Sequence, residues 1–438
     1  MQVLFHLFLF TSYGALGIFM FDPSVGYGEV ANGGSQLIQL LSTSSAVYSI
    51  VLIAGSPRAM AILKRSAPIF LLCALALLSA GWSVDWWLTV RRAIMLSISL
   101  LLGIAMVGRL GTAGATKLVV QSMSLTCALS VLAVWTMPGL AIHQATDEFQ
   151  TVHAGLWRGL LGHKVELGSF SGLTLALVAY FRASAFPNPM VAVGAAACAV
   201  SCLLGSGSAT GLTIFATLWV TLVFAHRVVR RPRNRRAAAL STFTLGLAVF
   251  AVLIHTGTLD TLSSYVGRSS DLTGRATYWP HVETIINQRS PWLGFGYGAG
   301  FKLVSPLAEE LSGTRLMEAH NGYIEMLVAF GKLGAPVVFA IIGLFFWRAR
   351  NLLGLDWLRV SKFIALPSCL LAAQFFTCHV ESIILAQNGV WAALFALSVA
   401  LIGDLQIEHE VSMRALSLAV ASFRQPDPDH GTVIQLAA

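Results

Sequence analysis

The run AIMLSISLLLGIAMVG fills residues 93–108 without a charged side chain, and LVVQSMSLTCALSVLAVWTM follows at residues 118–137. A helix needs about 20 mostly apolar residues to cross the hydrocarbon core of a bilayer. We therefore predict two membrane-spanning helices here, joined by the short segment that carries Arg109 and Lys117.

The composition of the whole chain agrees with this prediction. Of 438 residues, 56% are hydrophobic and only 11% are charged. Soluble domains carry about 25% charged residues, so this chain lacks the charge that would cover a water-facing surface. A soluble globular fold, a disordered chain and a secreted disulfide scaffold are excluded. The prediction is an all-α polytopic membrane protein.

Apolar runs of similar length recur along the chain, and each is expected to form one spanning helix. The first run has no basic residue before it, so we expect it to stay as a helix rather than act as a signal peptide. The runs lie near residues 2–20, 35–55, 67–83, 93–108, 118–137, 169–185, 189–204, 210–226, 238–256, 327–347, 363–379 and 387–403.

The basic residues predict the orientation of these helices. With about 12 helices and both termini in the cytoplasm, the cytoplasmic segments hold 18 of the 28 lysines and arginines, as the positive-inside rule requires. The cluster HRVVRRPRNRR at 226–236 is the strongest orientation signal. Because the net charge of +8 sits largely in such loops, nucleic-acid binding is not expected.

The predicted organisation is one transmembrane catalytic domain, residues 1–403, followed by a cytoplasmic tail, residues 404–438. On the external side, residues 257–327 form a long loop between helices 9 and 10. Loops of that length usually carry function. We expect this one to be partly helical, since Thr273 and Pro280 suit the first turn of a helix.

Ten basic residues lie on the predicted external side, where the positive-inside rule disfavours them. They include Arg91, Arg92, Arg158, Arg268 and Arg275. Each could pair with a nearby acid such as Asp85, Glu166 or Asp271. As a set they favour an anionic ligand, since the planar guanidinium fork fits phosphate oxygens in two-point contacts. The glycines of GFGYGAG, residues 294–300, favour a re-entrant turn packed on the helices over a phosphate-cradling loop.

His320 lies where the long external loop enters the tenth predicted helix. A lone histidine is more often a packing residue, but its usual pKa of about 6.5 also suits removal of a proton from a hydroxyl. Asn321 and Glu325 follow on one helical face, where Glu325 could orient polar neighbours or simply stabilise the helix.

These segments together resemble the signature region of the O-antigen ligase and O-antigen polymerase superfamily, with its exopolysaccharide-polymerase branch as the most similar. The resemblance covers about residues 80 to 400. The motifs that carry it, in chain order, are WSVDWWLTVRRA (82–93), GHKVELG (162–168), SGSATGL (206–212), GRSSDLTGRATYWP (267–280), PWLGFGYGAGF (291–301) and AHNGYIEMLVAFGKLGAP (319–336).

The resemblance implies a GT-C-like glycosyltransferase of the bacterial inner membrane with its active site on the periplasmic side. Such enzymes transfer a glycan from an undecaprenyl-pyrophosphate carrier to a glycan or lipid acceptor. His320 matches the base for the acceptor hydroxyl. Arg275 matches the pyrophosphate site, with Arg268, Arg91 and Arg92 as further candidates. Supporting residues are Asn321, Glu325, Asp271, His163 and Lys164.

Charge stabilisation of the leaving pyrophosphate would come from arginines, since the only Asp-x-Asp pair, Asp427 and Asp429, lies in the predicted cytoplasmic tail. No metal and no cofactor are therefore expected, and attack opposite the leaving group would invert the anomeric centre. Other polysaccharide assembly and export proteins are candidate partners. Polymerase and ligase remain open, and a flippase or exporter of lipid-linked saccharides is the alternative function.

Overall fold

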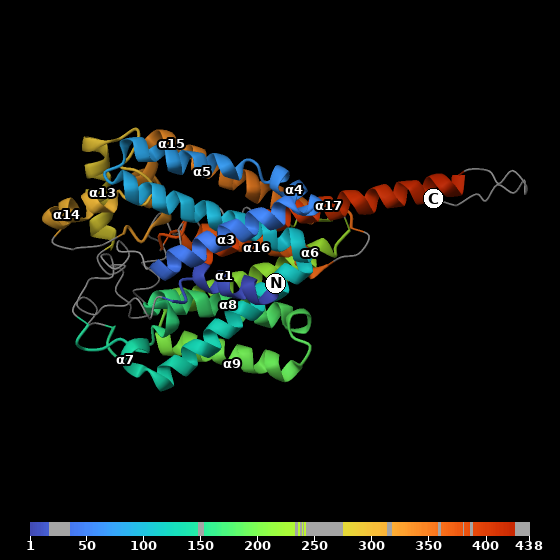
Figure 1. Cartoon of the computed structure of the whole chain (residues 1–438), viewed down its shortest axis with the longest axis horizontal. Helices are drawn as coiled ribbons and strands as arrows, with labels where there is room; N and C mark the ends of the chain where they lie inside the picture. The colour runs from blue at the N-terminus through green and yellow to red at the C-terminus, as the bar shows by residue number, and fades with distance from the viewer. Residues whose placement is uncertain are drawn as a thin grey trace, which may run out of the picture.

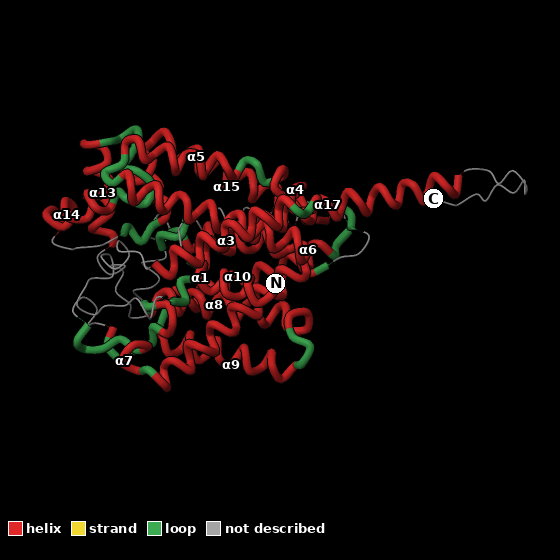
Figure 2. The backbone as a smooth tube through the Cα atoms, viewed as in Figure 1, coloured by secondary structure: helices red, strands yellow, loops and turns green. Residues whose placement is uncertain are grey.

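The chain is described here by a computed structural model. The described residues are 1–16, 36–147, 153–232, 235–236, 239, 241, 275–312, 318–357, 361–379, 381–385 and 389–424. Within these ranges the regular elements are helices, and the β-pairing is one isolated bridge between Ile142 and Trp157. Figure 2 shows helix along most of the described chain. The prediction of an all-α polytopic membrane protein is confirmed at this level.

The helices follow the predicted apolar runs closely. In chain order they are α1 (Gln2–Ser12), α3 (Gln36–Ala54), α4 (Pro57–Arg65), α5 (Ile69–Leu78), η2 (Ser79–Trp82), α6 (Trp86–Thr136), α7 (Pro138–Ala141), η4 (Gly159–Leu161), α8 (Lys164–Ala185), α9 (Pro189–Ser206), α10 (Ala209–Val229), α13 (Arg275–Arg289), α14 (Phe301–Ser312), α15 (Gly322–Gly354), η6 (Lys362–Ala365), α16 (Leu366–Thr377) and α17 (Val390–Arg424).

Two long elements are divided by a glycine. In α6, Gly111 has φ 67° and ψ 173°, so the predicted runs 93–108 and 118–137 form two arms that run in opposite directions (Figure 1). In α15, Gly331 has φ 61°. A Cβ at residue 331 would lie 2.4 Å from the carbonyl of Trp292, so only glycine fits this positive-φ contact.

Six described helices are long and apolar enough to cross a membrane, and a seventh results if α4 and the α5–η2 segment count as one span bent by 67°. Helices α8 and α16 also coincide with predicted runs, at 169–185 and 363–379. The run at 238–256 lies almost entirely outside the described residues. The count of twelve spans and the GT-C-like arrangement therefore stay predictions.

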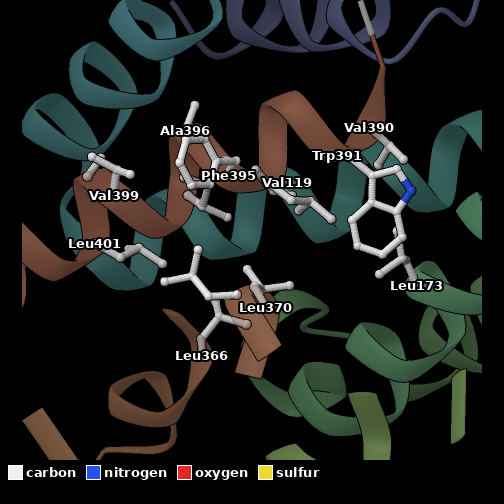
Figure 3. Close-up of a cluster of buried hydrophobic side chains, with 14 of the residues drawn as sticks. Val119, Leu173, Leu366, Leu370, Val390, Trp391, Phe395, Ala396, Val399 and Leu401 are labelled. Carbon is white, nitrogen blue, oxygen red and sulfur yellow. The ribbon is translucent and has the colours of Figure 1, made fainter. Parts of the chain in front are cut away.

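Helix α17 forms the centre of the bundle. In its most apolar 18-residue window 89% of the residues are buried, against 22% for α3 at the periphery. Figure 3 shows its Trp391, Phe395 and Val399 among side chains of α6, α8 and α16. Contact with α6 is close, since a Cβ on Gly103 would lie 2.8 Å from the backbone of Ala396. Small residues permit such approach between membrane helices.

Helix α17 continues past residue 403, where the cytoplasmic tail was predicted to begin. Asp404 is buried and accepts two hydrogen bonds from the Arg58 guanidinium, at 2.6 and 2.8 Å. It also accepts from the backbone and hydroxyl of Thr112. These bonds join α17 to α4 and to the turn of α6, so the helix extends unbroken to Arg424.

The two ends of the bundle differ in what they carry. One end holds α4, the last turn of α10 and the extension of α17, and the other holds α7, α13 and α14 (Figure 1). At the first end, Arg348 donates to the carbonyl of Arg65, and Arg236 contacts Asp356 at 3.3 Å. Basic residues of separate predicted cytoplasmic segments therefore gather at one end.

This gathering predicts the outcome of a topology experiment. A reporter fused after residue 236 should behave as cytoplasmic, and one fused near residue 305, in α14, should behave as external. Alkaline phosphatase and a fluorescent protein can serve as the paired reporters. Two fusions reporting the same side would contradict the orientation and, with it, the external position of His320.

Candidate functional site

His320 lies between two carboxylates that come from different parts of the chain. Its Nδ1 lies 3.1 Å from Oε1 of Glu318 and 3.4 Å from Oε2 of Glu381, which is 61 residues away in the α16–α17 connection. The His320 side chain is 25% exposed and that of Glu381 10%. Because Nδ1 faces both carboxylates, Nε2 is the nitrogen that can face a substrate.

The backbone at His320 is unusual and is held by its neighbours. His320 has φ 48°, a left-handed conformation that few non-glycine residues adopt. Directly after it, the Asn321 side chain caps α15 by accepting from the backbone N–H of Tyr323 and Ile324, at 3.0 and 3.3 Å. The predicted supporting residue Asn321 therefore fixes the point at which α15 begins.

Glu325 joins the two loops that meet at His320. Its Oε1 accepts from the backbone N–H of Ala319 at 2.9 Å and from the hydroxyl of Ser382 at 3.1 Å. Ala319 precedes His320, and Ser382 follows Glu381. Glu325 therefore links the segment just before His320 to the segment just after Glu381, and its supporting role at a site stays a prediction.

Helix α13 buttresses the same segment. Tyr278 and Val282 pack with α14 and the start of α15 in a separate hydrophobic cluster, and the Trp279 indole donates to the carbonyl of Ala319 at 2.8 Å. Arg275, the first residue of α13, lies one helical turn before Trp279. Through Trp279, helix α13 is joined to the residue that precedes His320. Arg268 and Asp271 lie outside the described residues.

Arg91 and Arg92 lie in the first turns of α6, at the same end of the bundle. Arg92 donates from Nη1 to the carbonyl of Gly298, and it shapes the glycine segment 294–300. Gly298 has φ 68°, and a Cβ there would lie 2.6 Å from Cδ of Arg92. Of the two alternatives for these glycines, the structure supports the turn packed on the helices.

Two other cations at this end of the bundle have carboxylate partners. Arg158 is buried and donates to Asp147 at 2.9 Å, and Lys302 lies 2.6 Å from Asp85. Arg158 also donates to the carbonyls of Leu140 and Gly139. Its guanidinium therefore links α7 to Asp147.

His163 belongs to a cluster of three histidines at the start of α8. The rings of His143, His153 and His163 lie 5.5 to 5.6 Å apart, centroid to centroid. His163 caps α8 by accepting at Nδ1 from the backbone N–H of Val165, and His143 accepts from that of Lys164. The predicted residues His163 and Lys164 thus contribute to the local structure of this end.

Burial keeps two of these histidines uncharged at neutral pH. It lowers the pKa of His143 to about 4, with Arg158 as a second cause, and that of His163 to about 3. His143 and His163 therefore add no positive charge to this end of the bundle at neutral pH.

The group of Glu318, His320 and Glu381 could also hold a metal ion. One ligand atom of each residue lies within 4.8 Å of the others. Two carboxylate oxygens with one imidazole nitrogen suit ions such as Mn²⁺ or Zn²⁺. The expectation of a metal-independent reaction therefore stays a prediction and requires its own test.

Sequence reasoning missed both carboxylate partners of His320. Glu318 was visible in the segment EAHNGYIE, two residues before the histidine. The sequence around Glu381 did not indicate a site residue, because no motif there shows that this segment contacts the segment of His320. His143 and His153 were missed because their spacing to His163 matches no helical or metal-binding pattern that would indicate contact between the three rings.

A comparison with protein families supports the resemblance that the motifs indicate. Residues 194–339 match the family described as O-Antigen ligase. The matched segment extends from α9 to α15 and includes Glu318, His320 and Glu325, whereas Arg91, Arg92, His163 and Glu381 lie outside it. A search of curated proteins found no match. The match over residues 194–339 therefore supports the resemblance to the O-antigen ligase and O-antigen polymerase superfamily.

Proposed function

We propose that the protein is an inverting, metal-independent glycosyltransferase. It would move a glycan from undecaprenyl pyrophosphate to a glycan or lipid acceptor, as a polysaccharide polymerase or an O-antigen ligase. The family match supports an enzyme of the ligase or polymerase type in general. The observation that carries the finer proposal is the position of His320 between Glu318 and Glu381.

The carboxylates give the imidazole the geometry of a general base. A carboxylate that accepts Nδ1–H fixes the tautomer and stabilises the imidazolium that forms, as in catalytic triads. Nε2 then takes the proton of the acceptor hydroxyl while the hydroxyl oxygen attacks the anomeric carbon. The bond from that carbon to the pyrophosphate oxygen breaks, and its electron pair leaves with the lipid pyrophosphate. Attack opposite the leaving group inverts the anomeric centre.

Charge on the leaving pyrophosphate would be stabilised by arginines of the same end. Arg275 is the first candidate because its helix is bonded through Trp279 to the residue before His320. Arg268, Arg91 and Arg92 are further candidates. Fixed guanidinium groups stabilise developing charge without reorganising during the reaction. Arg92 already donates one N–H to Gly298, so its remaining donors would face the substrate.

The site is proposed to lie on the periplasmic side of the bacterial inner membrane, with both termini in the cytoplasm. The gathering of Arg58, Arg65, Arg236 and Arg348 at the opposite end supports this orientation. Partners would be the lipid-linked donor, the acceptor and membrane lipid, together with other polysaccharide assembly and export proteins.

The test of the function supplies purified protein in liposomes with a lipid-linked oligosaccharide repeat unit and sizes the product. A ladder of longer glycans identifies a polymerase, and single transfer to an added lipid core identifies a ligase. Movement of the lipid-linked saccharide across the bilayer without a new glycosidic bond would contradict the enzyme and support the flippase alternative.

Variants of His320 and Arg275 should distinguish the loss of the general base from the loss of carrier binding. His320→Ala removes the proton acceptor and should lower the transfer rate about 100- to 10,000-fold while carrier binding persists. Arg275→Lys keeps the charge but loses the two-point fork. Carrier binding should weaken about 10- to 100-fold, the equivalent of one charge-assisted hydrogen bond. Both quantities are measured in detergent with purified variants.

Helix α13 provides matched controls for this pair. His281→Ala and Arg289→Lys change the same residue types on the same helix, and Arg289 is the last residue of α13. Both variants should transfer at close to the wild-type rate. Transfer by His320→Ala within a few-fold of wild type would remove the base assignment.

Metal removal tests the other use of the carboxylate–histidine group. Activity should survive EDTA, because arginines rather than a metal ion would stabilise the leaving group. The assay compares transfer before chelation, after chelation and after addition of Mg²⁺, Mn²⁺ or Zn²⁺. A loss with EDTA that a metal ion restores would contradict the proposal and make Glu318, His320 and Glu381 the ligands to examine.

A further inference from the structure

A cavity of about 490 Å³ lies at the end of the bundle opposite His320, between α4, α15 and α17. It is far from the proposed glycosyl-transfer site and plays no part in that mechanism. Its polar and aromatic lining consists mainly of Lys64, Arg65, Trp347, Arg348, His409 and Glu410. The lining combines groups that would contact an anion with groups that would contact lipid.

The charged part of the lining is predominantly basic. Arg65 forms two hydrogen bonds with Glu410, at 3.0 and 2.8 Å, and Arg348 donates from Nη1 to the carbonyl of Arg65 at 2.8 Å. Lys64 is exposed on the same helix end. Three cations and one carboxylate thus line the cavity, so the lining carries an excess of positive charge, and hydrogen bonds hold Arg65 and Arg348 in place.

The apolar part of the lining has one strongly exposed side chain, Trp347, which is 57% exposed. Pro68 and Leu355 are half-buried and Leu352 is buried. Tryptophan is enriched where membrane helices meet the headgroup layer. A ligand that matches this lining has a phosphate at one end and hydrocarbon at the other.

Helix α4 gives an independent reason to place the cavity at the membrane surface. Pro57–Arg65 is a short helix that buries Ala59 and Ile62 and carries Lys64 and Arg65 in its last turn. It meets the α5–η2 segment at an angle of 67°, so it does not continue the direction of that span. Short amphipathic helices with cations on the polar side lie in the headgroup region.

We propose that this cavity binds the phosphate headgroup of an anionic phospholipid, with Lys64, Arg65 and Arg348 on the phosphate and Trp347 against the acyl chains. Basic pockets between membrane helices on the cytoplasmic side are suited to such headgroups. The site is separate from the donor site and would fix the basic end of the bundle at the inner leaflet.

The experiment measures the thermal unfolding midpoint of the purified full-length protein in mixed micelles. Phosphatidylglycerol should raise the midpoint relative to phosphatidylcholine, and the shift should saturate with lipid. Lys64→Gln should weaken the apparent affinity for phosphatidylglycerol about fivefold, the effect of one cation near a membrane surface. Because Lys64 is exposed, this variant is expected to fold. The double variant Lys64→Gln with Arg348→Gln should bind phosphatidylglycerol more weakly than Lys64→Gln alone.

Lys117→Gln is the matched control, since Lys117 is exposed on α6 and does not line the cavity. It should retain the wild-type affinity. Equal weakening by Lys117→Gln and Lys64→Gln would indicate diffuse surface attraction and overturn the proposal. Inorganic phosphate and glycerol phosphate distinguish a lipid from a free phosphate. Either one giving the full shift at millimolar concentration would overturn the lipid assignment.

Discussion

The buried carboxylate of Asp404 holds the bundle together at the point where α17, α4 and the turn of α6 meet. It accepts hydrogen bonds from Arg58 and from Thr112, and its side chain is fully buried. Arg58 is 41% exposed, but its removal would leave the buried Asp404 carboxylate without its cation, which destabilises the fold. Only 11% of the residues in this chain are charged, and a buried charge such as Asp404 requires hydrogen-bond and ion-pair partners within the fold.

Charged side chains at the opposite end of the bundle also have partners within the fold. Arg158 and Asp147 form a buried ion pair there, and the Glu325 carboxylate accepts hydrogen bonds from Ala319 and Ser382. The Glu325 contacts hold together the two segments that carry His320 and Glu381, and His320 lies between Glu318 and Glu381 with a left-handed backbone. A residue held in a strained conformation by several neighbours is typical of a functional site.

Periodicity and composition predict the helices of this chain well, because an apolar run of sufficient length has few alternatives in lipid. Even the division of α6 follows from the charged, glycine-containing gap between two runs. The length of α17 was not predictable, since Asp404, Glu408 and Glu410 look solvent-exposed until their partners Arg58 and Arg65 are known.

The site was predictable only in part, for a related reason. His320 was identified because its own segment places it at a helix start with Asn321 and Glu325. The partnership with Glu381 depends on two loops that are brought together by tertiary packing, and no local pattern encodes that contact. The same holds for the contact between His143, His153 and His163, which come from segments on either side of Arg158.

Glu381 and His320 are proposed to act as one catalytic unit, and a double-mutant cycle on the transfer rate tests this most directly. Glu381→Gln alone should slow transfer about tenfold or more, consistent with the loss of a charge-assisted hydrogen bond. On the His320→Ala background the same change should cost nothing further, since residues that act together are non-additive. An equal loss on both backgrounds would contradict the account.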